Sequence, residues 1–247
     1  MSVLKGEGKV PILFNTTSVA VGPVTRTAYL ARPDLAGEWP TVILVASAWG
    51  VTSSMKDVCR RLARQGLAVL APDLYRGRPP DGAADLAAAV AAYDAIEDAV
   101  ADLELIASFV SNPAGHWSSA EHGLGVLGLG VGGRHAAAAS GLGDVLALAY
   151  ADIREPEGGS ILDVVSHLAV PLLGLYGRAD ERVPVADVLA LREAAPHAEL
   201  VLYDNVGHDF LDDHRQGYDH EAASDAIERL ASFFSKHLPS DGLSGAS

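Results

Sequence analysis

One segment, Val126–Ala138, constrains this chain more than any other. It contains an apolar run, then closely spaced glycines, then an alanine-rich run, an order that predicts a strand, a sharp turn and a helix. Two kinds of site are built on such a turn. One is a nucleophile elbow, G-x-Nuc-x-G, with Ser or Cys at its tip. The other is the dinucleotide-binding turn G-x-G-x-x-G, which Gly128, Gly130 and Gly133 satisfy literally. The tip of an elbow here is Gly130, which has no side chain with which to attack.

Segments typical of strands and of helices alternate along the rest of the chain, which predicts the α/β class. The expected strands are 11–15, 25–32, 41–46, 67–72, 124–129, 145–150, 171–176 and 199–203. The expected helices are 53–65, 85–110 with one break allowed, 184–194 and 220–237. We therefore expect a single domain over residues 1–238, with a mainly parallel sheet, helices on both faces and no large cap domain. Residues 239–247 are rich in Ser and Gly and are expected to form a flexible tail.

The composition and net charge of the chain limit the classes of partner that it is expected to bind. The 247 residues are 49% hydrophobic, as suits one folded domain with a sizeable core. The net charge of −14 argues against nucleic acid or an anionic membrane as a partner. No apolar run is long enough to span a bilayer, and the N-terminal residues lack the apolar core of a signal peptide. We expect a cytoplasmic protein, a monomer or small homo-oligomer, that binds a small-molecule substrate.

The chain has one cysteine, Cys59, so no internal disulfide forms, which suits a reducing compartment. Cys59 lies in the apolar stripe of the helix expected at 53–65. A thiol in such a place behaves as a small hydrophobe, so we expect core packing rather than a displaced nucleophile. No His/Cys cluster has the spacing of a zinc site, and we expect no metal or other cofactor.

The loops after later strands help to decide how the glycines are used. A dinucleotide site has some support, because Asp152 follows the strand at 145–150 where a ribose-binding carboxylate would stand. Against it, the glycine turn comes after several strands and half of the chain. A nucleophile elbow is followed in chain order by an acid and a His, each after a strand. Asp180 and His208 fill those places, at ends of parallel strands where open α/β sheets bind ligands. This order favours hydrolytic chemistry and leaves dinucleotide binding as a distant alternative.

Several short motifs, in this order and spacing, resemble those of the dienelactone hydrolases over about residues 25–238. They are A-P-D-L-Y (Ala71–Tyr75), G-x-x-D-x-x-V-P (Gly177–Pro184), G-H-x-F (Gly207–Phe210), Tyr218 and the closing helix that contains Phe233–Leu238. The resemblance implies a compact α/β-hydrolase fold with a Cys-His-Asp triad that acts on lactone or ester bonds.

Carried over by position, the resemblance implies that Asp180 is the triad acid and His208 the base. It also implies that the backbone N–H groups of Val131 and Ala48 form the oxyanion hole. Two positions depart from the family pattern. Gly130 stands where the family has its cysteine, and Ser47 stands where the family often has a glutamate.

Glycine at the elbow tip keeps a turn of positive φ at little steric cost and opens a space beside His208. Three explanations stay open: a different reaction, an engineered variant without its nucleophile, or a non-catalytic binding or scaffold protein of the same fold.

The leading hypothesis is an enzyme in which Asp180 orients His208 as a general base. His208 would activate water, for non-covalent hydrolysis, or a substrate C–H or O–H, for a lyase or isomerase reaction. The oxyanion hole would bind the developing alkoxide or enolate. The hydroxyl of Ser47 is a candidate for a relocated nucleophile. The residues expected to shape the substrate pocket are Gly130, Val131, Ala48, Trp49, Tyr75, Arg76 and Phe210.

Overall fold

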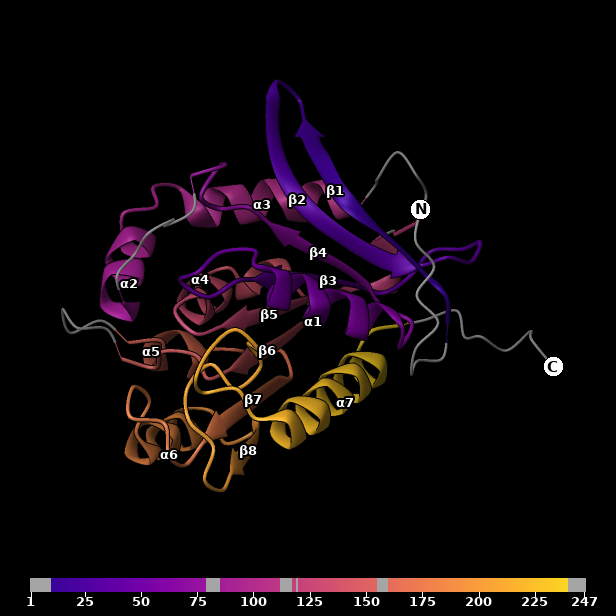
Figure 1. Cartoon of the computed structure of the whole chain (residues 1–247). Coiled ribbons are helices and arrows are strands. Elements are labelled where there is room, and N and C mark those ends of the chain that lie inside the picture. The colour runs from indigo at the N-terminus through magenta and orange to yellow at the C-terminus, as the bar shows by residue number, and fades with distance from the viewer. Residues whose placement is uncertain (1–9, 79–84, 112–116, 119, 155–159, 240–247) are drawn as a thin grey trace.

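The computed structural model describes residues 10–78, 85–111, 117–118, 120–154 and 160–239 (Figure 1). Within these residues, eight strands form one sheet and helices cover both of its faces, as the alternating sequence pattern predicts. All but the first residue of the tail expected to be flexible lies outside the described residues. The predicted α/β class with a mainly parallel sheet is confirmed.

The sheet has the spatial order β1-β2-β4-β3-β5-β6-β7-β8. β1 and β2 form an antiparallel hairpin, β2 pairs antiparallel with β4, and the strands from β4 to β8 run parallel. The central strands β3, β4 and β6 are buried at every position, because helices cover both faces of a parallel sheet. The bounds are β1 Ile12–Val21, β2 Val24–Pro33, β3 Thr41–Val45, β4 Ala68–Pro72, β5 Leu124–Leu129, β6 Val145–Ala149, β7 Leu172–Gly177 and β8 Glu199–Tyr203.

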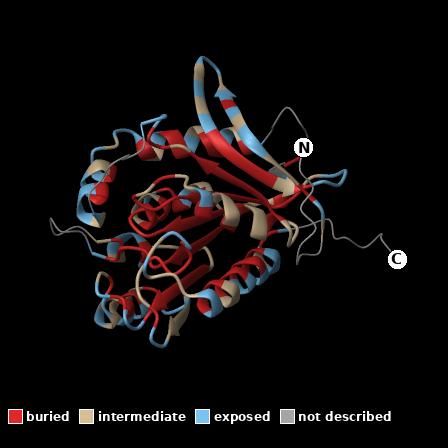
Figure 2. Ribbon diagram, viewed as in Figure 1, coloured by how far each residue is buried: buried red, intermediate tan, exposed pale blue. Residues whose placement is uncertain are grey.

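The N-terminal hairpin is longer than the sequence predicts. β1 and β2 pair over ten positions each, and Gly22, at φ +58°, turns the chain between Val21 and Val24. The outer part of β1 carries Thr and Ser and is largely exposed, so it lacks the apolar run from which a strand is predicted. The strand expected at 11–15 is therefore only the start of β1. Figures 1 and 2 show the hairpin extending above the rest of the sheet with much of its outer part exposed.

The helices separate into two groups. α1 and α7 pack with one buried apolar cluster, and α2 to α6 pack with a second cluster on the other face of the sheet. None of the helices in the described residues has the length and apolar character that crossing a bilayer requires. The bounds are α1 Ser53–Ala63, α2 Leu86–Asp94, α3 Ala99–Val110, α4 Gly132–Ala138, α5 Leu162–Val165, α6 Val185–Ala194 and α7 His220–His237, with 3₁₀ turns at Ala120–His122 and Ser140–Leu142.

Two local features differ from a simple helix pattern. The helical region expected at 85–110 is divided into α2 and α3, and Asp98 between them has φ +60°. The single turn α5 was not expected, because four residues are too short to show a helical period. Cys59 is fully buried within α1, as predicted. Burial raises the pKa of the Cys59 thiol to about 12, so this thiol stays protonated at neutral pH.

Candidate active site at the carboxyl ends of the strands

The candidate site lies where the sheet changes its direction of winding. β3 is flanked by β4 on one side and β5 on the other, and Val45 pairs in register with Gly128. The loops that leave β3 and β5 therefore start side by side, one with Ser47 and the other with Gly130. Open α/β sheets bind ligands at such a point, because two neighbouring loops diverge there and leave a crevice.

Gly130 forms the turn between β5 and α4 and has φ +53°. Its N–H donates to the Ala149 carbonyl at 3.2 Å, and its own carbonyl accepts from Gly133 N–H at 3.0 Å. A Cβ placed on Gly130 would lie 3.3 Å from Ser47 Cβ and 3.7 Å from His208 Nε2. The backbone thus has the left-handed conformation expected of an elbow tip, and any side chain there would begin between Ser47 and His208.

The neighbouring glycines let α4 pack tightly against the sheet. A Cβ on Gly128 would lie 2.6 Å from Gly133 Cα, one on Gly132 would lie 2.2 Å from the Ala46 carbonyl oxygen, and one on Gly133 would lie 2.3 Å from Ala151 Cβ. All three positions face protein atoms and leave no room there for a pyrophosphate, so close packing accounts for Gly128 and Gly133 of the G-x-G-x-x-G pattern, and the turn accounts for Gly130.

Asp152, the other residue of the dinucleotide hypothesis, is engaged by the Arg182 guanidinium. Both of its carboxylate oxygens accept hydrogen bonds, Oδ1 from Nε at 2.7 Å and Oδ2 from Nη2. A carboxylate paired in this bidentate way is not free to bind a ribose hydroxyl. The structure gives dinucleotide binding no support.

His208 and Asp180 form the hydrogen bond that the sequence predicts. His208 Nδ1 lies 2.8 Å from Asp180 Oδ2. The other carboxylate oxygen of Asp180 accepts from the N–H groups of Arg182 and Val183, at 2.8 and 2.9 Å. Because the carboxylate only accepts, Nδ1 carries the proton in the neutral imidazole, and Nε2 bears the lone pair. Asp180 is thus fixed by the backbone of its own loop and orients the imidazole.

Two side chains that the sequence analysis did not single out lie close to His208. The ring of Tyr150 meets the imidazole edge to face, with centroids 5.2 Å apart, and Asp209 Oδ1 lies 3.8 Å from Nε2. Both residues have positive φ, +41° for Tyr150 and +57° for Asp209. A position next to His208 in the sequence was the only signal for Asp209, and backbone conformation is not visible in a sequence.

The pKa of His208 is raised above its usual value. Burial is the strongest influence and lowers this pKa, but the hydrogen bond that His208 donates to Asp180 and the negative charge of Asp209 together outweigh it. Burial has the opposite effect on an acid, and it raises the pKa of the Asp209 carboxyl. The imidazole therefore keeps its proton to a higher pH than a free histidine, and its basic form is populated above that pH.

The two backbone amides expected to form the oxyanion hole are available. Within the described residues, neither Val131 N–H nor Ala48 N–H donates a hydrogen bond to another protein group. Ala48 is held in place because its carbonyl accepts from the Tyr75 hydroxyl at 2.6 Å. These amides belong to the residues that directly follow Gly130 and Ser47, on the loops after β5 and β3.

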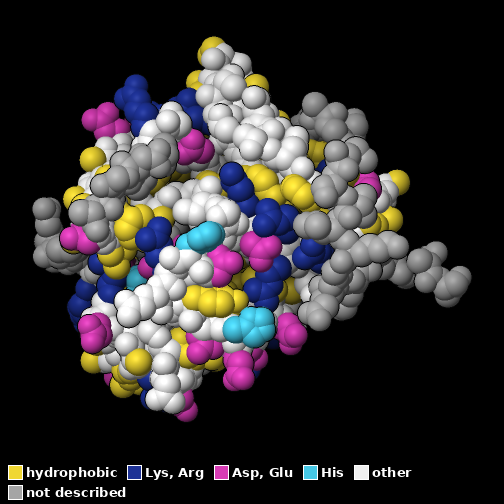
Figure 3. Space-filling view, in the orientation of Figure 1, with side chains coloured by type: hydrophobic (Ala, Val, Ile, Leu, Met, Phe, Trp, Pro, Cys, Tyr) yellow, Lys and Arg dark blue, Asp and Glu magenta, His cyan; other side chains and the backbone are white. Residues whose placement is uncertain are grey.

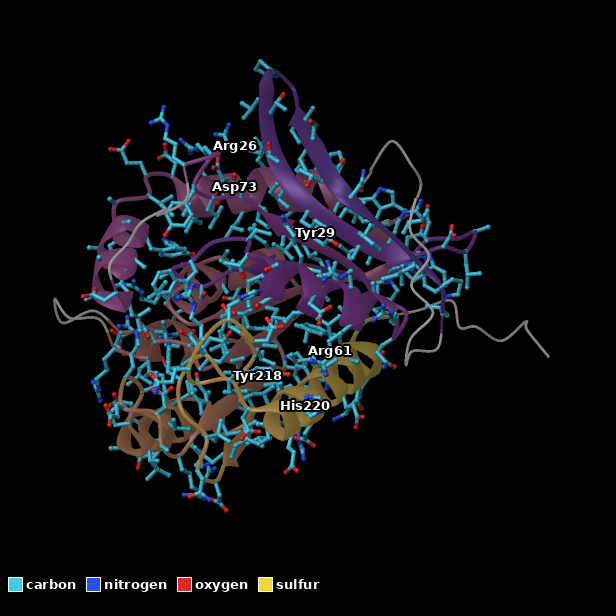
Figure 4. All side chains as sticks on the ribbon, viewed as in Figure 1. Arg26, Tyr29, Arg61, Asp73, Tyr218 and His220 are labelled. Carbon is cyan, nitrogen blue, oxygen red and sulfur yellow. The ribbon has the colours of Figure 1, made fainter. Side chains whose placement is uncertain are left out.

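Two of the other residues expected to shape the substrate pocket line a separate cleft. Trp49 and Tyr75 line a cleft of about 340 Å³ between the hairpin, α1 and the end of β4, and neither His208 nor Gly130 lines it. Figure 4 labels Tyr29 and Asp73 of the same lining, on β2 and just after β4. The cleft therefore adjoins the loop after β3 through Trp49.

Arg76 and Phe210 are not positioned for the pocket role expected of them. Arg76 donates to the buried Asp102 carboxylate at 3.0 Å, which ties its guanidinium to α3. Phe210 is fully buried, and its ring packs edge to face against Tyr150 and Tyr203. A side chain with no exposed surface supports its neighbours from behind and does not contact a ligand. Neither position could be predicted, because the direction of each side chain depends on partners distant in the sequence.

Charge near the site is mixed. On the face shown in Figure 3, acidic, basic and histidine side chains are interspersed. Within the described residues, no group of three or more His, Cys, Asp or Glu side chains is placed to hold a metal ion.

A sequence profile of the dienelactone hydrolase family matches residues 27–238. The chain belongs to the dienelactone hydrolase family. The match extends from β2 to α7 and includes every residue of the site described above.

Individual relatives agree with this assignment. The chain is 34% identical over 226 residues to a "putative carboxymethylenebutenolidase" of Salmonella typhimurium, covering 85% of this chain and 82% of the relative. It is 32% identical to a protein of the same name from Methylorubrum extorquens, covering 85% and 76%. Among solved structures, a "putative dienelactone hydrolase" from Klebsiella pneumoniae superposes with a TM-score of 0.80 at 30% identity, covering 91% and 99%. These relatives are named as hydrolases, and the solved Klebsiella pneumoniae structure has the fold observed here.

Proposed function

We propose that this protein hydrolyses a small lactone or ester by direct attack of water, with His208 as the general base. The observation that carries the proposal is the position of His208 Nε2. It lies 3.7 Å from the point where a side chain on Gly130 would begin, while Nδ1 is held by Asp180 at 2.8 Å. Water can occupy the place from which a side-chain nucleophile would attack, and the base that would activate either one is in reach.

The remaining steps use groups already described. His208 Nε2 accepts a proton from water as the water oxygen bonds to the carbonyl carbon. The negative charge that develops on the carbonyl oxygen is stabilised by the N–H groups of Val131 and Ala48, and one such donor contributes about 10² to 10³-fold in rate. As the bond to the leaving oxygen breaks, the imidazolium returns its proton to that oxygen.

Ser47 is less suited to be the nucleophile. Its Cβ adjoins the Gly130 space, but within the described residues its hydroxyl makes no hydrogen bond with His208. A serine nucleophile needs its base within hydrogen-bond reach. We therefore assign Ser47 to the wall of the site. A serine-directed phosphonate probe should leave Ser47 unlabelled, and Ser47→Ala should keep its turnover.

The names of relatives support a substrate class. Besides the carboxymethylenebutenolidases, the chain is 27% identical to a "probable 2-oxo-3-(5-oxofuran-2-ylidene)propanoate lactonase" of Bradyrhizobium, over 92% of this chain and 96% of that protein. Both names describe a five-membered unsaturated lactone with a carboxylate on an exocyclic arm. We propose a lactone of this class as the substrate.

The test is turnover of such a lactone, and of small activated esters, by the wild type, His208→Ala and Asp180→Asn. His167→Ala is the matched control, because His167 is exposed on the turn after α5. His208→Ala should lower kcat/KM by about 10² to 10⁴-fold, whereas the control should not change it. Mass spectrometry should show a product heavier by one water; an isomer of unchanged mass would instead indicate proton transfer. Binding of the lactone without any turnover would indicate a binding protein and overturn the proposal.

A further inference from the structure

Two hydrogen-bond acceptors face each other beside Gly130. The Nε2 lone pair of His208 is one, because its Nδ1 donates to Asp180. The Asp209 carboxylate is the other, with Oδ1 at 3.8 Å from Nε2. The Asp209 side chain is nine-tenths buried, and within the described residues it forms no hydrogen bond to another protein group. Two buried acceptors at this separation repel each other unless a donor lies between them.

We propose that Asp209 and His208 together hold the attacking water, each accepting one of its two hydrogens. An O–H···acceptor bond is about 2.8 Å long, so one water oxygen reaches both groups across the 3.8 Å that separates them. A water that donates both hydrogens keeps its lone pairs free. Asp209 is thus a water-positioning residue of the proposed hydrolysis, and this inference rests on that proposed function.

Glycine at position 130 leaves space for the attacking water in this arrangement. A Cβ there would lie 3.7 Å from His208 Nε2, in the region that the water and the substrate carbonyl need. Glycine at 130 leaves that region open, and Asp209 supplies a second acceptor for a nucleophile that is no longer attached to the protein. Glycine at 130 and the Asp209 carboxylate, which accepts no hydrogen bond from the described residues, are therefore parts of one arrangement.

The step balances without any further reactant. The water oxygen forms a bond to the carbonyl carbon, and the π pair moves to the carbonyl oxygen. One proton goes from water to His208 Nε2, while the other stays on the attacking oxygen, hydrogen-bonded to Asp209. Collapse of the tetrahedral intermediate breaks the bond to the leaving oxygen, which takes the proton from His208. One water is consumed, and nothing is oxidised or reduced.

Asp209→Asn is the direct test, because asparagine has nearly the same shape and also tolerates φ near +57°. Asp204→Asn is the matched control: it removes the same charge from the same loop, but Asp204 is exposed. We expect Asp209→Asn to lower kcat about tenfold to a hundredfold with little change in KM, since the orientation of the nucleophile is lost. Asp209→Gly, which accepts the positive φ without strain, is a second variant if Asp209→Asn fails to fold.

The pH profile separates positioning from a merely structural role. The basic form of His208 carries the activity, and the negative charge of Asp209 raises the pKa of His208. The rise of kcat/KM with pH should therefore move to lower pH in Asp209→Asn and stay in place in Asp204→Asn. The charged and titratable groups around the imidazole are Asp180 on the β7 loop, Asp209 on its own loop, Asp152 and Tyr150 after β6, and Arg182, which pairs with Asp152.

A single turnover in H₂¹⁸O tests whether the water attacks directly. Direct attack places ¹⁸O in the product acid and none in the peptide that contains Asp209. If ¹⁸O appears in Asp209 and not in the first product, Asp209 is a covalent nucleophile and the inference is overturned. Unchanged kcat and unchanged pH profile in Asp209→Asn would also overturn it, while His208-dependent turnover would leave the proposed function standing. A wild type without His208-dependent turnover refutes the proposed function itself.

Discussion

Replacing Gly130 by cysteine tests whether the base and the oxyanion amides are in working positions. Gly130 has φ +53°, and a non-glycine residue there costs on the order of 1–3 kcal/mol. The new Cβ would lie 3.3 Å from Ser47 Cβ, so Ser47 must shift by a few tenths of an ångström. The lower conformational entropy of the unfolded variant offsets about 0.4–1 kcal/mol of this cost. With the shift of Ser47 included, we expect a net loss of about 0.5–2.5 kcal/mol.

For a chain of this size, each kcal/mol lowers Tm by about 2–4 °C, so Gly130→Cys should unfold roughly 1–10 °C below the wild type. Gly130→Ala carries the same backbone strain without a thiol and should melt at a similar temperature. A variant with an unchanged Tm would show that the left-handed turn at residue 130 is not maintained in the protein.

The reactivity of the new thiol in Gly130→Cys is measured with iodoacetamide near neutral pH. The Cβ of the introduced cysteine would lie 3.7 Å from His208 Nε2, and a neighbouring imidazolium lowers the pKa of a thiol. The wild type is a clean control, because its only cysteine, Cys59, is fully buried. We expect labelling of the variant alone, together with turnover of small activated esters. Adding His208→Ala should suppress both.

A variant thiol that is labelled but hydrolyses no ester would refute the reasoning. In that case the thiol is accessible and activated, so the failure must lie in the oxyanion amides or in the return of the proton by His208. The proposed hydrolysis by water depends on the same groups, and a binding role would then be the better account of this fold.

Two further predictions concern stability. Gly133→Ala would place a Cβ 2.3 Å from Ala151 Cβ and should destabilise the protein by more than about 3 kcal/mol, whereas Gly141→Ala has open space and should change it by less than about 1 kcal/mol; urea unfolding of both variants compares them. The raised pKa of His208 means that its protonated form stabilises the folded state, a contribution present below the unfolded pKa of about 6.5 and lost as pH rises through the folded value. The unfolding free energy of the wild type relative to His208→Gln should therefore be larger at about pH 6 than at about pH 9, and equal differences at the two pH values would contradict the raised pKa.

Much of the fold follows from local sequence pattern. Continuous β-branched and leucine runs such as 41–46 and 124–129 bury on both faces, so each indicates a parallel strand without reference to the rest of the chain. The glycine turn after β5 and the order of Asp180 and His208 along the chain are equally local. Because parallel strands end at one edge of the sheet, that order was enough to predict their hydrogen bond.

Tertiary structure decided what the glycines and the nearby side chains do. Whether Gly133 faces a phosphate or the Cβ of Ala151 depends on how closely α4 approaches β6, a contact between segments distant in the chain. The burial of Phe210 and the approach of Asp209 to His208 Nε2 depend likewise on how the loop after β8 packs on Tyr150. The backbone of that loop has positive φ at Asp209, and local propensity does not predict such a conformation for an aspartate. Residue types and their order therefore predicted that His208 and Asp180 pair, while the packing of distant segments determined which other side chains face them.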